Sequence, residues 1–306
     1  MEATLTLRSE KLTATLSACG ARLDTLCVGS GPSLVLHAGG DHVDLWRACY
    51  AGAIVGPVAN RVAGGRVPIG DRTFQMPCNE AGVTALHSGP DGLDVRIWSV
   101  QACSDSRVHY QTVLGDGESG LPGHRVIDAT YTLEAESLTV EIHATTDAPS
   151  PINIAHHPYW RLGDARAHRL QIEADTYLPV TDLNLPTGQI AAVAGTRFDH
   201  RQPKVVDPGL DHNFCLARAE RTAPAPVATL LGADGVRLHI ESTAPGLQVY
   251  AGSGLPCLAG TDIAPGAGLA LEPQGWPDAV NRAGFPHSIY TPDRPYRQVT
   301  RYRIAT

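Results

Sequence analysis

Long apolar runs, an excess of basic residues and closely spaced cysteines are all missing from this sequence of 306 residues. No apolar run approaches the roughly 20 residues that cross a bilayer, so we expect no membrane partner. Acidic residues outnumber basic ones and give a formal net charge of -7, which disfavours nucleic acid as a partner. A small, neutral and polar ligand suits this charge better.

The seven cysteines are dispersed along the chain, and their spacing predicts no zinc site or other metal centre. An odd, scattered set is typical of reduced thiols, so we expect a cytoplasmic protein. Residues 1–16 alternate between polar and apolar side chains, which predicts a strand, whereas a signal peptide needs a continuous apolar stretch. We expect a monomer or a homodimer.

Helical patterning is also missing, since no window of a dozen residues carries an apolar helical stripe free of glycine and proline. Alternating patterns occur instead, and turn signals such as Gly115-Asp116-Gly117 separate them. They include an N-terminal hairpin that turns at Gly20. No linker, repeat or low-complexity tract divides the chain. The sequence predicts an all-β fold, with two packed sheets in a single domain spanning residues 1–306.

The segment from Pro151 to Leu162 contains two adjacent histidines followed by proline and two aromatic residues. Neighbouring side chains of an extended segment point to opposite faces. Alternation with Ile152 and Ile154 places His156 on the core side and His157 on the other. A histidine that titrates near neutral pH could act there as a general acid, although a purely structural histidine explains the pattern equally well.

Glu272 is predicted at the end of an apolar strand over residues 268–271, because Pro273 should block continuation of the ladder. Burying a bare carboxylate is costly, so this glutamate is expected to be paired or catalytic. Asp211 precedes another strand-like run. Its carboxylate could accept sugar hydroxyls or cap its own turn.

Two further candidates lie earlier in the chain. Asn60 and Arg61 occupy the glycine-bounded stretch GPVANRVAGGR, where the guanidinium could bind hydroxyls or a carboxylate, or form an ordinary surface ion pair. No helical pattern follows, so a phosphate-binding loop is not expected. His87 precedes a tight turn, which predicts an accessible side chain with either a catalytic or a capping role.

Seven motifs occur in the order found in the aldose 1-epimerase (galactose mutarotase) family: GPVANRV, LHSG, ESGLPG, INIAHHPYW, LDHNF, APGLQVY and LEPQGWPDAVN. The chain therefore resembles this family from about Gly56 to Asn281. The resemblance implies a large β-sandwich of the galactose mutarotase type, with a sugar cleft across one sheet. It also implies a cofactor-independent isomerase whose substrate is a small sugar.

The resemblance further assigns roles to individual residues. Glu272 resembles the family's catalytic base and His157 its catalytic acid, acting from opposite sides of the sugar ring. The residues that resemble its substrate-holding groups are Arg61, His87 and Asp211, with Asn60 as a support. Opening the ring of an aldose requires one base and one acid, and closing it on the other face of the aldehyde converts one anomer into the other.

Three residues depart from the family pattern: Ser88, Ala155 and Arg161. We expect them beside the pocket, where they would influence the preferred sugar.

Three alternatives remain open at this point. A hexose-6-phosphate 1-epimerase would need a basic cluster, for which Arg161 and Arg166 are the only suggestive residues. A non-catalytic sugar-binding module would not require an acid–base pair. A glycoside hydrolase would need two facing carboxylates, which Asp211 and Glu272 could imitate.

Overall fold

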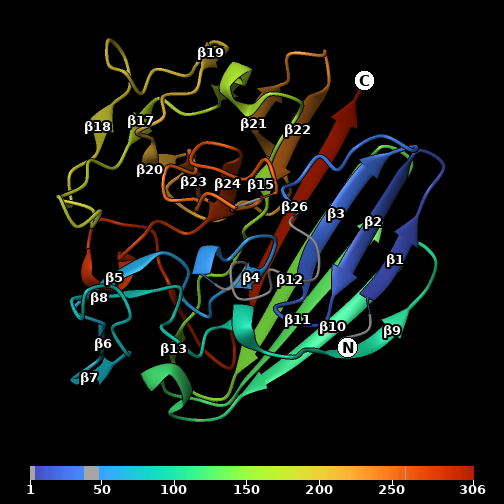
Figure 1. The fold of residues 1–306 in the computed structure, drawn as a ribbon. Coiled ribbons are helices and arrows are strands. Elements are labelled where there is room, and N and C mark those ends of the chain that lie inside the picture. The colour runs from blue at the N-terminus through green and yellow to red at the C-terminus, as the bar shows by residue number, and fades with distance from the viewer. Residues whose placement is uncertain (1–3, 38–47, 259) are drawn as a thin grey trace.

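The computed structural model describes residues 4–37, 48–258 and 260–306, and strands dominate it (Figure 1). Helix in these ranges is limited to residues 48–49 and to the single 3-10 turns η2 (Leu93–Val95), η3 (Glu118–Gly120), η4 (Ala165–Ala167) and η5 (Ala279–Asn281). The predicted all-β class is confirmed. Within these ranges, no helix has both the length and the apolar character to cross a membrane.

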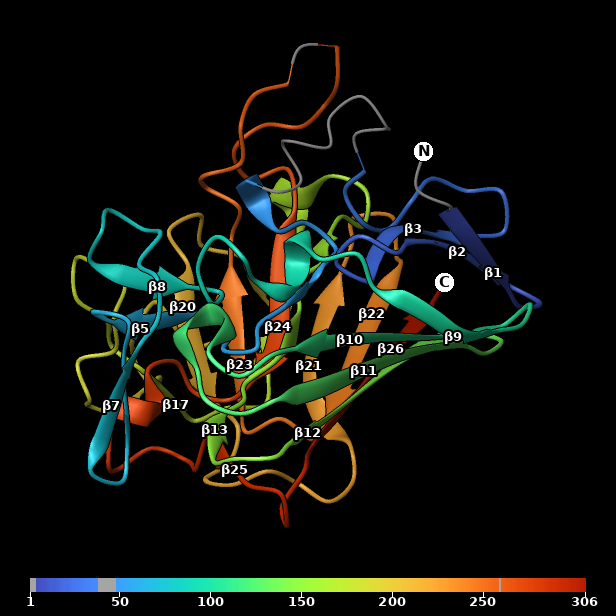
Figure 2. The same ribbon diagram turned by 90° about the horizontal axis from the view of Figure 1, so that it is seen from below.

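The largest sheet has nine antiparallel strands in the order β19-β16-β21-β22-β26-β12-β11-β10-β9. Figure 2 labels its strands from β21 to β9. In chain order its strands are β9 (Ser99–Cys103), β10 (Arg107–Leu114), β11 (Arg125–Leu133), β12 (Ser137–Thr146), β16 (Arg169–Ile172), β19 (Lys204–Val205), β21 (Ala225–Leu231), β22 (Arg237–Ser242) and β26 (Tyr296–Ala305). Buried and partly exposed residues alternate along the whole of β11, as expected for a strand with one face on the core.

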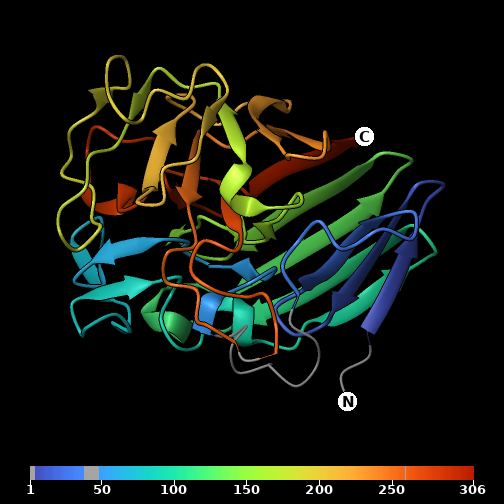
Figure 3. The ribbon, with the colours of Figure 1, turned by 45° about the horizontal axis from the view of Figure 1, so that its top comes forward.

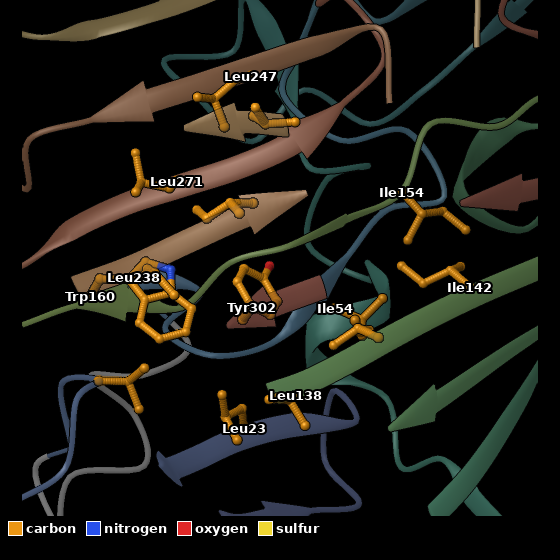
Figure 4. Packing of buried hydrophobic residues seen from close by; sticks show 14 of the residues in the cluster. Leu23, Ile54, Leu138, Ile142, Ile154, Trp160, Leu238, Leu247, Leu271 and Tyr302 are labelled. Carbon is orange, nitrogen blue, oxygen red and sulfur yellow. The ribbon is translucent and has the colours of Figure 1, made fainter. Parts of the chain in front are cut away.

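A second sheet has six strands in the order β15-β24-β23-β20-β17-β18. They are β15 (Tyr159–Trp160), β17 (Thr176–Tyr177), β18 (Ala191–Ala192), β20 (Asp211–Cys215), β23 (Gly246–Tyr250) and β24 (Leu269–Gln274). Leu247 on β23 and Leu271 on β24 belong to the same buried cluster as Leu138 on β12 and Tyr302 on β26 (Figure 4). The two sheets therefore pack face to face, which confirms the predicted sandwich.

The predicted N-terminal hairpin is confirmed as part of a three-stranded sheet of β1 (Thr4–Arg8), β2 (Leu12–Ser17) and β3 (Arg22–Val28). This sheet lies over strands β10 to β12 (Figure 3), and the hydroxyl of Tyr131 on β11 donates a hydrogen bond to the carbonyl of Ala21. It thus covers part of the large sheet that the six-stranded sheet leaves free.

Short strand pairs complete the described fold. They are β4 (Ile54–Val55) with β14 (Ala155–His156), β5 (Arg61–Ala63) with β8 (Thr84–Leu86), β6 (Arg66–Ile69) with β7 (Arg72–Gln75), and β13 (Ser150–Pro151) with β25 (Ile289–Tyr290).

The predicted strand end at Pro273 is wrong. Strand β24 continues to Gln274, and Pro273 lies opposite Leu247. The carbonyl of Pro273 accepts a hydrogen bond from Nε2 of Gln298 at 3.0 Å. In an antiparallel strand, the N–H and C=O of one residue point to the same side. The carbonyl of Pro273 points away from β23, so the N–H that proline lacks would also have pointed away from β23. No bond between β23 and β24 is lost there.

Candidate active site

A cavity of about 370 Å³ lies against the six-stranded sheet, on the face turned away from the core. This volume falls within the range of small-molecule sites. All six side chains predicted from the sequence line it: Asn60, Arg61, His87, His157, Asp211 and Glu272. The fold therefore brings together residues from four separate stretches of the chain and from the segment that joins β14 to β15.

Strand alternation explains why the sheet presents polar groups to this cavity. On β23, Leu247 and Val249 are buried in the core, whereas Gln248 and Tyr250 line the cavity. Glu272 pairs directly with Gln248 across the two strands, so the two side chains share a face. Gln248 was not among the predicted site residues, although the alternation within its APGLQVY motif was the signal that could have found it.

His157 and Glu272 are in contact, with Nε2 of the imidazole 3.5 Å from Oε1 of the carboxyl group. Both side chains are almost fully buried, and Oε2 of Glu272 has no hydrogen-bond partner among the described residues. Burial raises the pKa of Glu272 well above its ordinary value, Asp211 raises it further, and Arg61 opposes both. Burial also lowers the pKa of His157 to about 4. These directions hold the pair in its uncharged form, so the contact is not a permanent ion pair.

His156 points the other way, as the alternation predicted. Its Nδ1 lies 3.2 Å from the hydroxyl oxygen of Tyr302 on β26, and its ring contacts Tyr131 edge to face at 5.6 Å between centroids. Burial is the main reason that its pKa is lowered to about 3. His156 is therefore a structural histidine of the core, whereas His157 belongs to the cavity.

His87 and Asn60 hold each other in place. Both residues have a positive φ, 50° and 63°, which is uncommon outside glycine. The backbone N–H of Asn60 donates to Nδ1 of His87 at 3.2 Å, and the backbone N–H of His87 donates to the carbonyl of Asn60 at 3.1 Å. Since Nδ1 accepts a hydrogen bond, the proton of the neutral ring resides on Nε2. Burial lowers the pKa of His87 well below its usual range, so the ring is a neutral donor.

The predicted accessibility of His87 is wrong, because the residue is only 4% exposed. Its ring packs against Tyr50 at 4.5 Å and against His157 at 5.4 Å between centroids. These neighbours, which sequence adjacency does not reveal, cover the histidine while leaving it on the cavity wall.

Ligand atoms of His87, His157 and Glu272 all lie within 4.8 Å of one another, a spacing that raises the question of a metal site. A metal-bound histidine normally donates from its second ring nitrogen to an acceptor. In His87 this second nitrogen faces the N–H of Asn60, which is itself a donor. The hydrogen bonding of His87 therefore suits a neutral hydrogen-bond donor better than a metal ligand.

Arg61 lies between two carboxylates. Its Nε and Nη2 each donate to Glu80 at 2.8 Å, and its Nη1 lies 3.5 Å from Asp211. Asp211 also accepts a hydrogen bond from Nε2 of Gln248 at 2.6 Å. Burial raises the pKa of Asp211, while Arg61 and Gln248 lower it. Glu80 was not foreseen, since nothing in its local sequence indicates that the chain will fold it onto Arg61.

The chain is similar to known proteins over almost its whole length. Residues 3–303 match the model of the aldose 1-epimerase family. A galactose mutarotase from Mus musculus is 35% identical over an alignment that covers 98% of this chain and 93% of that protein.

The chain belongs to the aldose 1-epimerase family. It is accordingly an isomerase, with mutarotase activity. An aldose 1-epimerase from Escherichia coli K12 is 33% identical over an alignment that covers 84% of this chain and 81% of that protein. Among solved structures, an aldose epimerase homologue from C. elegans has a TM-score of 0.91 at 29% identity, covering 100% of this chain and 99% of the other. A galactose 1-epimerase from Lactobacillus acidophilus has a TM-score of 0.87 at 27% identity, covering 99% and 94%.

The three departures from the family pattern do not form the cavity wall, since none of the described residues that line the epimerase cavity is Ser88, Ala155 or Arg161. Ser88 directly follows the lining residue His87, and Ala155 belongs to a cluster that contacts the lining residue Tyr50. The hydroxyl of Ser88 is fully buried and bonds to both backbone groups of Val58. Ala155 packs in a small apolar cluster with Val55. Ser88 thus supports the backbone of Val58, and Ala155 packs in the cluster that contacts the cavity residue Tyr50.

The arginines considered for a phosphate site do not line the epimerase cavity either. Arg161 forms an ion pair with Asp262, and Arg166 is exposed on η4. The hexose-6-phosphate alternative is therefore not favoured.

The aromatic residues of the INIAHHPYW and LEPQGWPDAVN motifs differ in their positions. Tyr159 lines the cavity, whereas Trp160 and Trp276 are buried away from it.

Proposed function

We propose that this enzyme interconverts the α and β anomers of a free aldose, and that Glu272 and His157 exchange the two protons required for ring opening. The relatives named galactose mutarotase make galactose the first sugar to test. The observation that carries the proposal is the 3.5 Å contact between Nε2 of His157 and Oε1 of Glu272 in the wall of a cavity of about 370 Å³.

The close spacing of the two groups suits the reaction. The anomeric hydroxyl and the ring oxygen are bonded to the same carbon, so the acid and the base that serve them must be near neighbours. From the sequence, the acid and the base were expected on opposite sides of the ring, and that expectation stays a prediction. Two groups in contact can address two oxygens of one carbon, which supports the proposal.

In the forward step, the carboxylate of Glu272 takes the proton of the anomeric hydroxyl. That oxygen forms a double bond to the anomeric carbon, the bond from this carbon to the ring oxygen breaks, and the ring oxygen takes a proton from the imidazolium of His157. Rotation about the adjacent carbon–carbon bond turns the other face of the aldehyde toward the hydroxyl. Closure then reverses both proton transfers.

The pair needs one proton in total for this exchange. Carboxylic acid with neutral imidazole, and carboxylate with imidazolium, are two arrangements of the same proton across a 3.5 Å contact. Burial favours the uncharged arrangement, because it raises the pKa of Glu272 and lowers that of His157. The charged arrangement is the one that opens the ring, and the hydroxyls of the sugar replace the water that would otherwise stabilise it.

The other cavity groups would orient the sugar. His87 offers a neutral N–H donor to the oxygen on which charge develops, and Asn60 fixes the tautomer that makes this possible. Asp211 accepts hydrogen bonds from sugar hydroxyls, and Nη1 of Arg61 donates to them.

Polarimetry of freshly dissolved single-anomer sugars tests the proposal. Galactose, glucose, xylose, arabinose and fucose cover the main differences in hydroxyl configuration. Mutarotation faster than in buffer alone supports the assignment, and no acceleration for any of them contradicts it. An aryl glycoside serves as a control, because its cleavage would indicate a hydrolase with Asp211 and Glu272 as paired carboxylates.

A cytoplasmic location belongs to the same proposal. All seven cysteines are free thiols, and Cys103 and Cys257 are exposed, which suits a reducing compartment. Cell fractionation with an antibody to the protein tests this location.

A further inference from the structure

Glu80 contacts the substrate-holding arginine without lining the cavity itself. Its two carboxylate oxygens accept hydrogen bonds from Nε and Nη2 of Arg61, each at 2.8 Å. This is the bidentate geometry, in which two N–H groups of one guanidinium donate parallel hydrogen bonds to the two oxygens of one carboxylate. The contact is partly sheltered, since the side chain of Arg61 is 12% exposed and that of Glu80 is 35% exposed.

The carboxylate of Glu80 is held in place by its own surroundings. Thr84 donates its hydroxyl to Oε2 of Glu80 at 2.6 Å, and the backbones of the two residues exchange hydrogen bonds of 3.2 Å in both directions. Thr84 begins β8, which pairs with β5, and Arg61 begins β5. The pairing of β5 with β8 thus fixes the carboxylate and the base of the arginine relative to each other before any sugar arrives.

The consequence concerns the third guanidinium nitrogen. With Nε and Nη2 held by Glu80, only Nη1 is directed to Asp211, at the long distance of 3.5 Å. The second oxygen of Asp211 is engaged by Gln248 at 2.6 Å. Without Glu80, the guanidinium of Arg61 would be free to turn and form a bidentate pair with Asp211. The two groups would then have fewer donors and acceptors left for sugar hydroxyls.

We propose that Glu80 is a positioning residue of the sugar site, which holds Arg61 so that Nη1 is left for the sugar and Asp211 keeps its acceptor capacity. This inference rests on the proposed function, because it concerns the sugar bound in the same cavity. Glu80 acts through Arg61 on binding, not on the proton transfers of Glu272 and His157. Its loss therefore weakens sugar binding with little effect on the chemical step.

The test compares Glu80→Ala and Glu80→Gln with the wild-type enzyme on galactose. A matched control is Glu141→Ala, because Glu141 accepts a hydrogen bond from Nε of Arg297 at the same distance of 2.8 Å on the outer sheet surface. We expect KM to rise about tenfold in Glu80→Ala, the size of effect expected from one lost charge-assisted hydrogen bond, with kcat within about threefold. Glu80→Gln keeps one acceptor oxygen, so its KM should lie between that of Glu80→Ala and that of the wild type. Glu141→Ala should match the wild type.

Binding of galactose by calorimetry gives a second readout that does not depend on turnover. A galactose Kd that rises with KM in Glu80→Ala supports the inference, even if the proton-transfer roles prove wrong. An unchanged Kd and KM overturns it. A lower kcat with unchanged KM, accompanied by a lower melting temperature, also overturns it, because a merely structural role reduces the folded fraction without altering affinity. Failure of the wild-type enzyme to accelerate mutarotation would instead contradict the proposed function.

Discussion

Replacing Glu272 with glutamine removes the proposed base while it preserves the volume of the side chain. The residue is 2% exposed, so a change in size would disturb packing, but glutamine has the same number of heavy atoms. Its amide oxygen can still face Nε2 of His157, which lies 3.5 Å from Oε1 in the wild type. An amide does not take up a proton at ordinary pH, so only the proton-accepting capacity is lost.

The expected loss of rate follows from the role of the base. A positioned general base contributes about 10²–10⁴-fold, so Glu272→Gln should slow enzyme-catalysed mutarotation by at least about a hundredfold. The sugar should still bind, because the groups that hold it are unchanged.

The same substitution should stabilise the fold at neutral and higher pH. Burial raises the pKa of Glu272 well above its ordinary value of 4.5, so the folded state binds the proton more tightly than the unfolded state. Stability contributed by this group is fully present below the unfolded pKa and is lost as the pH rises through the folded pKa. Glutamine does not titrate and escapes this loss. Each unit of pKa elevation corresponds to about 1.4 kcal/mol of unfolding free energy, and each kcal/mol to about 2 °C of melting temperature or more.

Polarimetry with single-anomer galactose and thermal melts at pH 4.5 and pH 8 measure the two effects. We expect Glu272→Gln to melt above the wild type at pH 8 and near it at pH 4.5. Glu141→Gln, on the exposed sheet surface, should change neither rate nor melting temperature. A rate within threefold of the wild type would refute the base assignment, and a lower melting temperature at pH 8 would refute the reasoning on burial.

Further predictions concern the neighbours of Glu272. His157→Asn should reduce kcat about 10²–10⁴-fold while calorimetry still detects sugar binding, and retained turnover would contradict its role as acid. A profile of kcat/KM against pH should fall below about pH 4, where the lowered pKa of His157 lets the pair take a second proton, and again above the raised pKa of Glu272, where the pair loses its only proton. Arg61→Lys keeps the charge but loses the planar, bidentate guanidinium, so KM should rise more than kcat falls. Equal effects on KM and kcat would contradict a binding role. Tyr302→Phe removes the partner of buried His156, so chemical denaturation should show a loss of about 1–3 kcal/mol while the mutarotation rate is unchanged.

The sequence by itself determined which way individual side chains face. Alternation along an extended chain is a local property, so it correctly separated His156 from His157 and predicted the all-β class. The same alternation places Gln248 opposite in direction to the core residue Leu247. The order of family-like motifs pointed to the six cavity residues, although it did not state their contacts.

Only the tertiary structure decided which of these side chains meet. The contact between His157 and Glu272 depends on β15 pairing with β24, and strands so far apart in sequence are paired by burial and backbone hydrogen bonding across the whole sheet. The burial of His87 and the contact of Glu80 with Arg61 arise in the same way. Pro273 remains within β24 because the N–H that it lacks would have pointed away from the partner strand β23. No local sequence pattern could reveal this direction.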